Sequence, residues 1–570
     1  MSIRLIYIGL ARRKEIAYAK AVIESVLGGV SYSRASLERI IDVVQRTDND
    51  QILGSDSPEQ LERAHELIHG LHSLLPPHPL YSYSCLVVVS DPKPSHFRVS
   101  LDSVMKQSAP SFEVIVGFNG SPKTAVRQVF VELQQKYAGK LFSVETPLGP
   151  ETRLFNLLAQ KASSNILVFF TQDGRMRFDL LFRFEQMFRM FPDPETTVIY
   201  SKETDAAHHG RTFHFPYVFD ASVPNCIAIS KSIWNQIGGF REELHGAHFY
   251  DLLLRLDLAG VNMHETPTSL YSIRNSKAAL EEKAVKAFAD YVQQKQLDWT
   301  IEKGEVPYTL RAIPKDKQGI SIHVIVPFKD QKEVTLLAIN SLKRQKGLDL
   351  RITAVDNWSS DLSIGKELQS MRVEVLRIDE PFNFSRLNNL AITHTKVGTN
   401  SSLLFFMNND VELSRDDSLL EMTRWIDQPG IGMVGCCLYY PNGLLQHGGM
   451  HLDKTAPAYK TSWSHTEHQL PYHDLRLART LRVVDCVTGA AILMRRDLFQ
   501  KVGGFDEIWH PNSGSDTNLA EKLKTIGLSC FYTPFASAIH HESLSRINGA
   551  FFEEYENLTI LQDYYRTYLQ

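Results

Sequence analysis

The sequence predicts an α/β protein built from two similar units that follow a helical N-terminal region. Two observations support this fold class. Short apolar runs of strand length alternate with helix-like stretches from residue 85 onward. One series of short motifs also occurs twice along the 570-residue chain. Repeats this long indicate whole domains rather than solenoid units.

The composition is typical of a globular protein and excludes several function classes. Charged residues make up 22%, hydrophobic residues 43%, and the net charge is −4, so we expect no nucleic-acid partner. Six cysteines without CxxC spacing favour a reducing cytoplasm over a disulfide or zinc framework. No apolar run approaches 18 residues, so we expect no membrane span. Peripheral association with the inner face of the cytoplasmic membrane is left open.

Residues 1–80 are predicted to form a helical region. Apolar residues recur at spacings of three and four in Ile16–Leu27 and again in Leu61–Leu75. The stiff Pro76–Pro79 stretch then marks the first boundary. Its position places the first α/β unit at residues 81–276.

The first unit is expected to contain strands at Leu86–Val89 and Glu113–Val116 and a helix at Val126–Tyr137. Strand and helix alternating at this pace imply βαβ units on a mainly parallel sheet. A linker at 277–319 follows. The second unit is expected at 320–570.

The linker is predicted to begin with a helix that Ser276 caps. Leu280, Ala284, Phe288 and Tyr291 share one face of this helix. The polar stretch 315–319 ends the linker. An aromatic-rich helix is expected at Phe551–Leu569, and we assign it no role.

Polar residues follow two apolar runs of the second unit. Asp356 comes directly after Ile352–Val355, and Asn408-Asn409-Asp410 follows Leu403–Phe406. An isolated Asp after a strand is usually a turn former or a helix cap. Ligands, however, bind at the carboxyl ends of parallel strands, and two such places in one unit favour a site. Carboxylate and amide oxygens suit a hard divalent cation that bridges phosphates, and His540 could add an imidazole, which Mn²⁺ tolerates better than Mg²⁺.

Taken in order, the motifs of residues 320–550 resemble those of nucleotide-sugar glycosyltransferases of family 2, which have the GT-A fold. The resemblance is closest to the tandem proteins, with two GT-A units, that build bacterial O-antigen, rhamnan and related surface polysaccharides. The motifs that carry it are Val324–Asp330, Val355–Asn357, Phe382–Asn389, Asn408–Glu412, Gln446–Gly449, Thr488–Ala490, Gly503–Glu507 and His540–Arg546.

The resemblance implies an inverting enzyme that moves a sugar from a nucleotide-diphosphate sugar to a glycan or lipid-linked glycan acceptor. It assigns Asp516 as the base that deprotonates the acceptor, and Asp410 and His540 as ligands of Mn²⁺ or Mg²⁺. The implied donor-binding residues are Pro327, Asp356, Arg386, Asn389, Asn408 and Asn409. The implied acceptor-side residues are His447, Thr488, Gly489 and Ala490.

Two positions depart from the family pattern. Trp358 stands where the family usually has glycine, and Asn518 replaces a frequent second aspartate. Both departures predict an unusual donor pocket.

The first unit carries an altered version of the same series. Its corresponding stretches are Leu86–Val89, Val116–Asn119, Arg153–Leu157, Phe169–Asp173 and Gly238–Phe240. The metal triplet has become Thr171-Gln172-Asp173, the base position falls on Phe249, and Ser272 replaces the family histidine. We therefore expect this copy to be inactive.

Another register would place Asp251 opposite Asp516, because each lies eleven residues after the phenylalanine of its Gly-Gly-Phe motif. The next glycine, however, is nine residues beyond Asp251 at Gly260 and eleven beyond Asp516 at Gly527. This mismatch, together with the motif around Tyr250, favours pairing Phe249 with Asp516.

Two alternatives to a single working site remain. A bifunctional transferase or polymerase would need an unorthodox base in the first unit. The second alternative is a scaffold that binds sugars or partners without catalysis. In that case Asp410, Asp516 and His540 would match the catalytic pattern of the family by chance.

Overall fold

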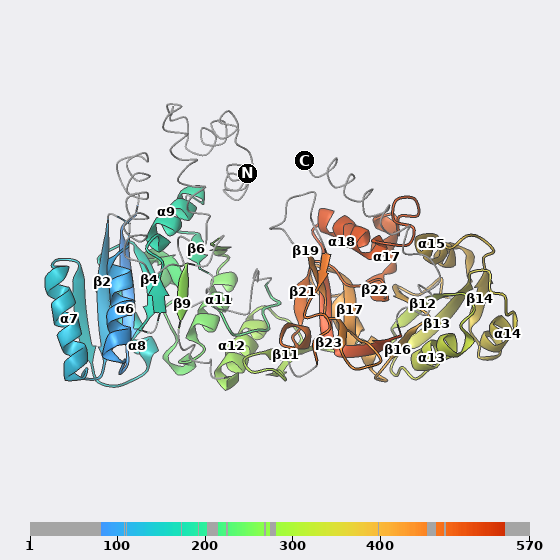
Figure 1. Ribbon diagram of the computed structural model, residues 1–570, viewed down its shortest axis with the longest axis horizontal. Helices are drawn as coiled ribbons and strands as arrows, with labels where there is room; N and C mark the ends of the chain where they lie inside the picture. The colour runs from blue at the N-terminus through green and yellow to red at the C-terminus, as the bar shows by residue number, and fades with distance from the viewer. Residues whose placement is uncertain are drawn as a thin grey trace, which may run out of the picture. The chain divides into compact units, whose positions relative to one another are not determined.

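The computed structural model describes residues 81–541, except 108, 110, 173, 192, 202–214, 224–225, 267–269, 274–280, 397, 453–462 and 472–474. Helices expected at 1–80 and Phe551–Leu569, and the Ser276 cap, lie outside these residues. Among the described residues, no helix combines the length and apolar character needed to cross a bilayer. Contacts divide the chain into two compact units (Figure 1).

The first unit is built on a sheet with strand order β3-β2-β1-β4-β7-β6-β8. Its strands are β1 (Tyr83–Val89), β2 (Phe112–Asn119), β3 (Leu141–Thr146), β4 (Ile166–Thr171), β6 (Thr197–Tyr200), β7 (Ile227–Ser230) and β8 (Asn262–Glu265). β7 runs antiparallel to both of its neighbours, and the other neighbouring pairs are parallel. The small strands β5 (Gly174–Met176) and β9 (Tyr271–Ile273) pair separately.

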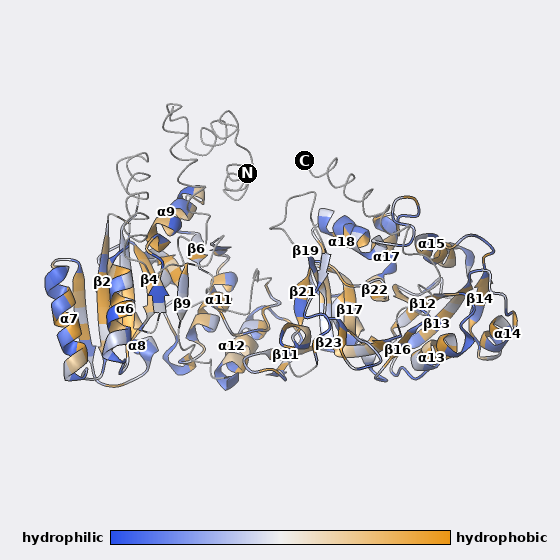
Figure 2. Cartoon of the chain, viewed as in Figure 1, coloured by the Kyte–Doolittle hydropathy of each residue, from blue (hydrophilic) through white to orange (hydrophobic). Residues whose placement is uncertain are grey.

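Helices accompany this sheet. They are α6 (Pro94–Met105), α7 (Thr124–Lys136), α8 (Glu151–Lys161), α9 (Leu180–Met190), α10 (Lys231–Gln236), η1 (Glu242–Leu244), α11 (His248–Leu258) and α12 (Glu281–Gln294). All seven residues of β1 are buried, as expected for a parallel strand with both faces covered. Figure 2 shows the apolar strands in orange and the polar surface of α7 in blue. Ala284, Phe288 and Tyr291 are buried along α12, so the predicted apolar face is confirmed.

The second unit has the strand order β14-β13-β12-β15-β22-β17-β23-β16. Its main strands are β12 (Ser321–Phe328), β13 (Asp349–Asp356), β14 (Glu374–Arg377), β15 (Leu403–Met407), β16 (Val411–Leu413), β17 (Ile431–Tyr439), β22 (Ala491–Arg495) and β23 (Ser529–His540). Its helices are α13 (Lys332–Lys343), α14 (Ser363–Ser370), α15 (Phe384–His394), α16 (Ser418–Ile426), α17 (Arg496–Lys501) and α18 (Ser515–Thr525). Shorter elements are β18 (Leu445–His447), β19 (Met450–Leu452), β20 (Trp463–His465), η4 (Leu477–Arg479) and β21 (Arg482–Val484).

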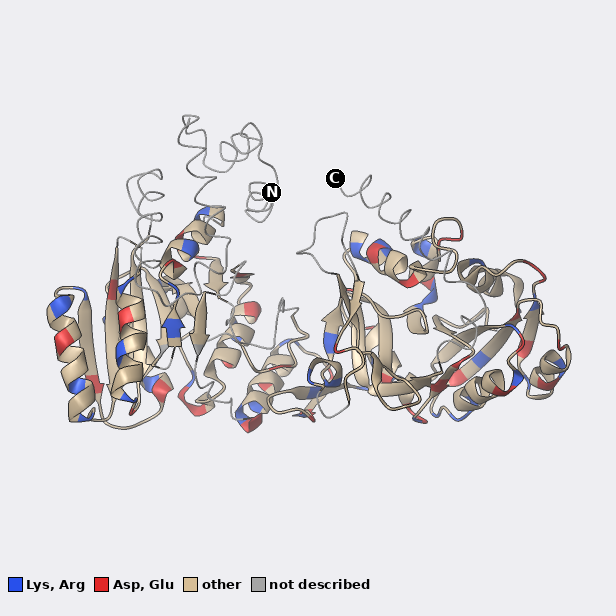
Figure 3. Cartoon of the chain, viewed as in Figure 1, with Lys and Arg blue, Asp and Glu red and all other residues tan. Residues whose placement is uncertain are grey.

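From β14 to β23 this sheet repeats the strand order and the strand directions found from β3 to β8. In both sheets four parallel strands are followed by an antiparallel strand, β22 or β7, and then by a parallel pair. The repeated motifs of the sequence therefore belong to a repeated fold. The predicted α/β class with mainly parallel sheets is confirmed. Acidic and basic residues are interspersed on outer helices such as α6, α7 and α18 (Figure 3).

The second unit begins earlier than the sequence predicts and is discontinuous along the chain. It includes residues from Gln296 onward and the segment Phe213–Asp220. The hairpin of β10 (Trp299–Lys303) and β11 (Leu310–Pro314), which falls in the predicted linker, thus belongs to it.

An aromatic cluster explains why these pieces join the second unit. Trp425 of α16 stacks on Phe531 of β23 with ring centroids 4.3 Å apart, and Trp299 of the hairpin lies 5.5 Å from Trp425. Tyr217 and Phe219 reach the same rings at 5.5 Å and 5.6 Å. Aromatic burial of this kind contributes strongly to a core.

Candidate active site

The carboxyl ends of three adjacent parallel strands bring the first candidate residues to one edge of the sheet. β13, β12 and β15 lie side by side in the order of the second unit. Asp356 ends β13, and Pro327 is the next-to-last residue of β12. Asn408 follows β15 directly. This is the edge at which α/β sheets bind ligands.

Asp356 organises the turn that follows β13. The residue is 4% exposed, and its carboxylate accepts hydrogen bonds from the Ser359 amide at 2.9 Å and from Arg377 Nη1 at 2.7 Å. Arg377 also donates to the Ser359 carbonyl at 3.2 Å. The sequence did not single out Arg377, because its role depends on the β13–β14 pairing.

Trp358 sits within this turn in the left-handed region, with φ 61°, and its side chain is 54% exposed. Residues with a Cβ rarely adopt this conformation, which glycine adopts freely. The backbone thus explains the glycine that the resemblance leads one to expect here. In this chain an exposed indole stands two residues from Asp356 instead.

Asp410 and His540 meet at the end of the sheet, where Val411 of β16 pairs with His540 of β23. The Asp410 Oδ1 atom lies 3.2 Å from His540 Nε2. His540 Nδ1 lies 2.6 Å from Oε1 of Gln446. Because that amide oxygen only accepts, Nδ1 is the donor in this bond, and Nε2 is the ring nitrogen that faces Asp410.

This donor set fits a divalent cation. A histidine that ligates a metal commonly donates its other N–H to an oxygen, as His540 does to Gln446. Within the described part of the chain, no group of three or more His, Cys, Asp or Glu side chains could hold a metal by itself. A cation on Asp410 and His540 would thus need further oxygen ligands from water or a bound phosphate.

Asp516 lies in the first turn of α18, against the segment 488–490 that leads into β22. Its Oδ2 atom accepts the Gly489 amide at 2.8 Å, and its Oδ1 atom accepts the Thr517 amide at 2.8 Å. The Ala490 carbonyl in turn accepts the Asn408 amide at 3.0 Å. Residues 488–490 therefore lie between the predicted base and the segment that carries Asp410.

His447 and Asn409 have partners that direct their side chains elsewhere. His447 is fully buried, its Nδ1 lies 3.0 Å from Nδ1 of His465, and its Nε2 accepts the Thr488 amide at 3.4 Å. Burial, with smaller contributions from nearby cationic groups, lowers the pKa of His447 well below its usual range. The Asn409 amide donates to Thr335 of α13 at 3.0 Å.

The sequence emphasised His447 and passed over its neighbour Gln446. Successive side chains of a strand face opposite sides, so only one of the two can reach His540. In β18 that residue is Gln446. The alternation along β18 was the signal that could have identified it.

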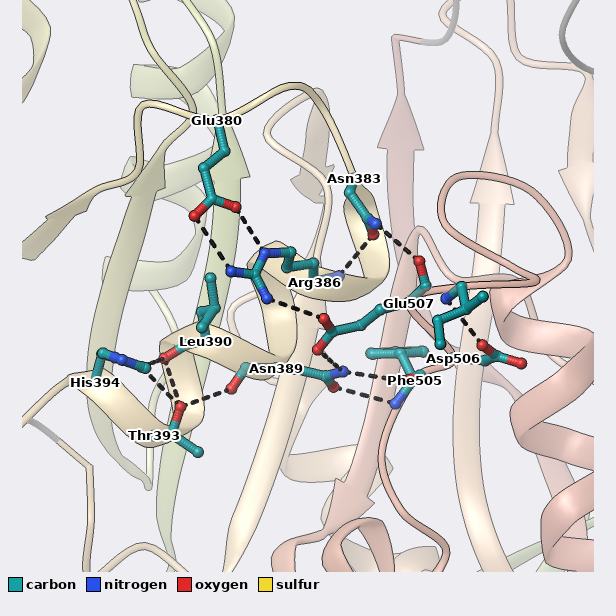
Figure 4. Close-up of polar contacts among 11 residues, drawn as sticks. Glu380, Asn383, Arg386, Asn389, Leu390, Thr393, His394, Phe505, Asp506 and Glu507 are labelled. Carbon is teal, nitrogen blue, oxygen red and sulfur yellow. Dashed lines mark hydrogen bonds and ion pairs between the residues drawn. The ribbon is translucent and has the colours of Figure 1, made fainter.

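Arg386 and Asn389 connect α15 to the loop after the Gly-Gly-Phe motif (Figure 4). Arg386 pairs with Glu380 at 2.6 Å and with Glu507 at 3.2 Å, and these bonds raise the pKa of its guanidinium. The Asn389 amide donates to the Phe505 carbonyl at 2.9 Å and accepts the Phe505 amide at 3.1 Å. Both predicted donor-binding side chains thus contact protein groups here.

The pair of hydrogen bonds between Asn389 and the Phe505 backbone, which we name the asparagine latch, also occurs in the first unit. Asn156 of α8 exchanges two hydrogen bonds of 2.9 Å with Phe240. The second glycine of each Gly-Gly pair has a positive φ, and a Cβ there would lie 2.8 Å from Asn389 Oδ1 or 2.7 Å from Asn156 Oδ1. The latch therefore belongs to the fold and explains the Gly-Gly motif.

The structure confirms the register chosen for the two copies. α11 and α18 each have 11 residues, which aligns His248 with Ser515 and Phe249 with Asp516. Arg255 donates to the Gly239 carbonyl at 2.7 Å, and its counterpart Lys522 donates to the Gly504 carbonyl at 2.9 Å.

The base position of the first unit is filled by an aromatic ring. Phe249 is 5% exposed and packs near Phe155, Phe169 and Phe240. Asp251, aligned with Asn518, is 1% exposed and is held by Arg241 and Arg255. Ser272 lies in β9, and Asp173 is outside the described residues.

Comparison with known proteins identifies the second unit. The model of glycosyl transferase family 2 matches residues 323–503. The match includes Asp356, Asp410 and residues 488–490, and it ends before Asp516 and His540. This part of the second unit is therefore similar to the domains of glycosyl transferase family 2.

Three curated relatives resemble the chain. It is 26% identical over 496 residues to the uncharacterized protein y4gI of Sinorhizobium fredii, covering 81% of this chain and 53% of that protein. It is 29% identical to the O-antigen biosynthesis protein RfbC of Myxococcus xanthus, covering 57% of this chain and 26% of RfbC. It is 30% identical to an N-acetylglucosaminyl-diphospho-decaprenol L-rhamnosyltransferase of Mycobacterium tuberculosis, covering 23% of this chain and 43% of that enzyme. The chain thus spans about half or less of each relative.

Proposed function

We propose that the second unit is an inverting, metal-dependent glycosyltransferase that acts in the assembly of a bacterial surface polysaccharide such as O-antigen. Its donor is a nucleotide-diphosphate sugar, and its acceptor is a glycan or a lipid-linked glycan. The observation that carries this proposal is the placement of Asp516 and the Asp410–His540 pair around residues 488–490.

Asp516 supplies the base. Its carboxylate takes the proton of the acceptor hydroxyl while that oxygen attacks the anomeric carbon and the bond to the nucleoside diphosphate breaks. One displacement inverts the anomeric centre. Hydrogen bonds from Gly489 and Thr517 hold the carboxylate in place. A positioned general base typically contributes about 10²- to 10⁴-fold in rate.

Asp410 and His540 would hold the cation beside the donor diphosphate. When bound, Mn²⁺ or Mg²⁺ would offset the negative charge that grows on the departing diphosphate. Gln446 keeps the His540 ring oriented through its 2.6 Å hydrogen bond. Asp356 and Pro327, at the ends of neighbouring strands, would bind the nucleoside.

The first unit is proposed to be an inactive copy that binds the acceptor or supports the second unit. Phe249 fills the place of the base and packs among Phe155, Phe169 and Phe240. A lipid-linked acceptor would bring the protein to the inner face of the cytoplasmic membrane. The name of the mycobacterial relative mentions a diphospho-decaprenol, which makes this acceptor class worth testing.

Donor hydrolysis tests the proposal. The protein is incubated with UDP-glucose, GDP-mannose and dTDP-rhamnose, in Mn²⁺ and again with excess EDTA. We expect release of nucleoside diphosphate from at least one donor, and its loss on chelation. Binding of a donor without turnover under every condition would instead support a non-catalytic scaffold.

A further inference from the structure

We propose that Ile508 and Trp509 form the surface on which the sugar rings of the acceptor rest. This inference rests on the function proposed above and deepens it. Both residues lie on the loop 506–512, between Phe505 and α18, which we name the pinned loop. Their side chains are 79% and 51% exposed, which is unusual for large apolar residues on adjacent positions of an ordered loop.

The pinned loop is rigid from within. The Asp506 Oδ1 atom accepts the amides of both Ile508 and Trp509 at 3.0 Å. Its Oδ2 atom lies 3.3 Å from Nδ1 of His510, which is itself buried. These bonds form a tight turn of the backbone at Ile508 and Trp509.

Helix α15 holds the loop from outside. Ser385 donates through its hydroxyl to the His510 carbonyl at 2.6 Å and through its amide to the Pro511 carbonyl at 3.0 Å. Asn383 donates to the Glu507 carbonyl at 2.9 Å, and Arg386 pairs with the Glu507 carboxylate (Figure 4). The loop's polar groups therefore fix its backbone, while its two large apolar side chains remain exposed to solvent.

The first unit provides an internal comparison. Its corresponding loop runs from Phe240 to Phe249, whereas the loop of the second unit runs two residues longer, from Phe505 to Asp516. The shorter loop forms η1, and Leu244, which aligns with Trp509 by count from the phenylalanine, is fully buried. At this loop, exposed large apolar side chains are thus found in the unit that retains the base and not in the other.

The position and charge of the loop favour a sugar as the occupant. The loop ends two residues before α18, whose second residue is Asp516, so an acceptor hydroxyl at that base belongs to a ring close to α18 and to the loop. An indole offers a flat apolar face with negative charge density, which suits the C–H face of a sugar ring. Residues 506–514 contain Asp506 and Glu507 and no Lys or Arg, a composition that disfavours an anionic lipid surface.

The test measures how the donor sugar is divided between water and an added acceptor. Wild type, Trp509→Ala, Ile508→Ser and Trp509→Phe are each given the donor that wild type consumes, with methyl α-glucoside, methyl α-mannoside and methyl α-rhamnoside as acceptor probes. Leu148→Ala, an 81% exposed apolar residue of the first unit, is the matched control. Thermal unfolding confirms that each variant is folded.

We expect Trp509→Ala to lower the ratio of transfer to hydrolysis about tenfold. Ile508→Ser should lower it less, and Trp509→Phe should retain most of it. Donor hydrolysis without acceptor and the Leu148→Ala ratio should stay at wild-type values. An unchanged ratio in Trp509→Ala would overturn the acceptor surface and leave the proposed function standing.

Two other outcomes would also overturn the proposal. If wild type consumes no donor, the proposed function fails and the acceptor surface fails with it. If Trp509→Ala keeps the transfer ratio but loses binding to phosphatidylglycerol vesicles that wild type shows, the loop is a membrane contact instead.

Discussion

The Gly489 amide donates a hydrogen bond of 2.8 Å to Oδ2 of Asp516. This bond joins the segment just before β22 to the first turn of α18, although the two residues are 27 positions apart. It sets the orientation of the carboxylate that we assign as the base. Any variant at Asp516 therefore tests chemistry and local geometry together.

Asp516→Asn should lower sugar transfer by about 10²-fold or more, because the amide cannot take the acceptor proton. Its side-chain oxygen can still accept one of the two backbone amides, so the fold and the affinity for nucleoside diphosphate should persist. Transfer rate and nucleotide titration on the same preparation check this. Full transfer by the variant would remove Asp516 from the mechanism.

Asp410→Ala and His540→Ala should each weaken Mn²⁺-dependent binding of UDP or GDP while leaving binding of the bare nucleoside nearly unchanged, because a cation held by these residues would interact with phosphate oxygens, which the nucleoside lacks. Calorimetric titration with and without Mn²⁺ separates the two. Gln446→Leu removes the 2.6 Å bond to His540 and should show a smaller loss in the same direction. Metal-independent binding by wild type would contradict the metal assignment.

Asp173→Ala in the first unit, a residue outside the described part of the chain, should leave the transfer rate near wild type. Phe249 occupies the base position there, and a phenyl ring cannot accept a proton. The stringent comparison uses the Asp516→Asn background, where adding Asp173→Ala should change nothing. Residual transfer that disappears in the double variant would show a second working site.

The asparagine latches allow a matched pair of variants. Asn389→Ala and Asn156→Ala each remove two hydrogen bonds to a phenylalanine backbone and should each lower stability by about 1–3 kcal/mol. Amide hydrogen exchange should become faster at Phe505 in one variant and at Phe240 in the other. Only Asn389→Ala should also slow transfer, since its latch precedes the pinned loop. Equal effects on transfer would argue against a special role for that loop.

Stability should fall as the pH drops from about 6.5 towards 4, because His323 resists protonation in the fold. Burial and the nearby Arg496 lower the pKa of His323 to about 4, and its ring already accepts from Arg496 at 3.1 Å. As the pH falls, the unfolded chain takes up a proton on His323 before the folded chain does. The contribution of neutral His323 to the free energy of unfolding is therefore complete above pH 6.5, and up to about 3 kcal/mol of it is lost as the pH falls through the folded-state pKa. Urea unfolding of wild type and His323→Gln at several pH values should show that the free energy of unfolding depends less steeply on pH in the variant.

The sequence predicted the α/β class and the repeat, because strand length, alternation and motif order are local signals. The edge of the sheet at which it places the site stays a prediction. The sequence also predicted the pairing of Phe249 with Asp516, which the equal lengths of α11 and α18 confirm. The order of the motifs predicted that His540 lies near Asp410. No spacing in the sequence could have given the distance between the two side chains.

Other contacts depended on partners that are far away in the sequence. Arg386 pairs with Glu507, 121 positions further on, and a motif alone does not indicate whether an arginine faces a ligand or a carboxylate. The boundary near residue 296 was missed for a similar reason. Tyr217, Trp299 and Trp425 meet only through tertiary packing. From the sequence alone, a hairpin that packs one face on a domain cannot be distinguished from a linker between domains.

The discontinuous second unit has a consequence for how this gene can be divided. A clone that starts at codon 296 omits Tyr217 and Phe219, whose rings lie on Trp425 and Phe531. It also omits Asp220, which pairs with Arg476 at 3.1 Å. Such a fragment would display an apolar surface and should precipitate on expression. The coding regions of the two units are interleaved, so recombination at a single breakpoint cannot exchange either one intact.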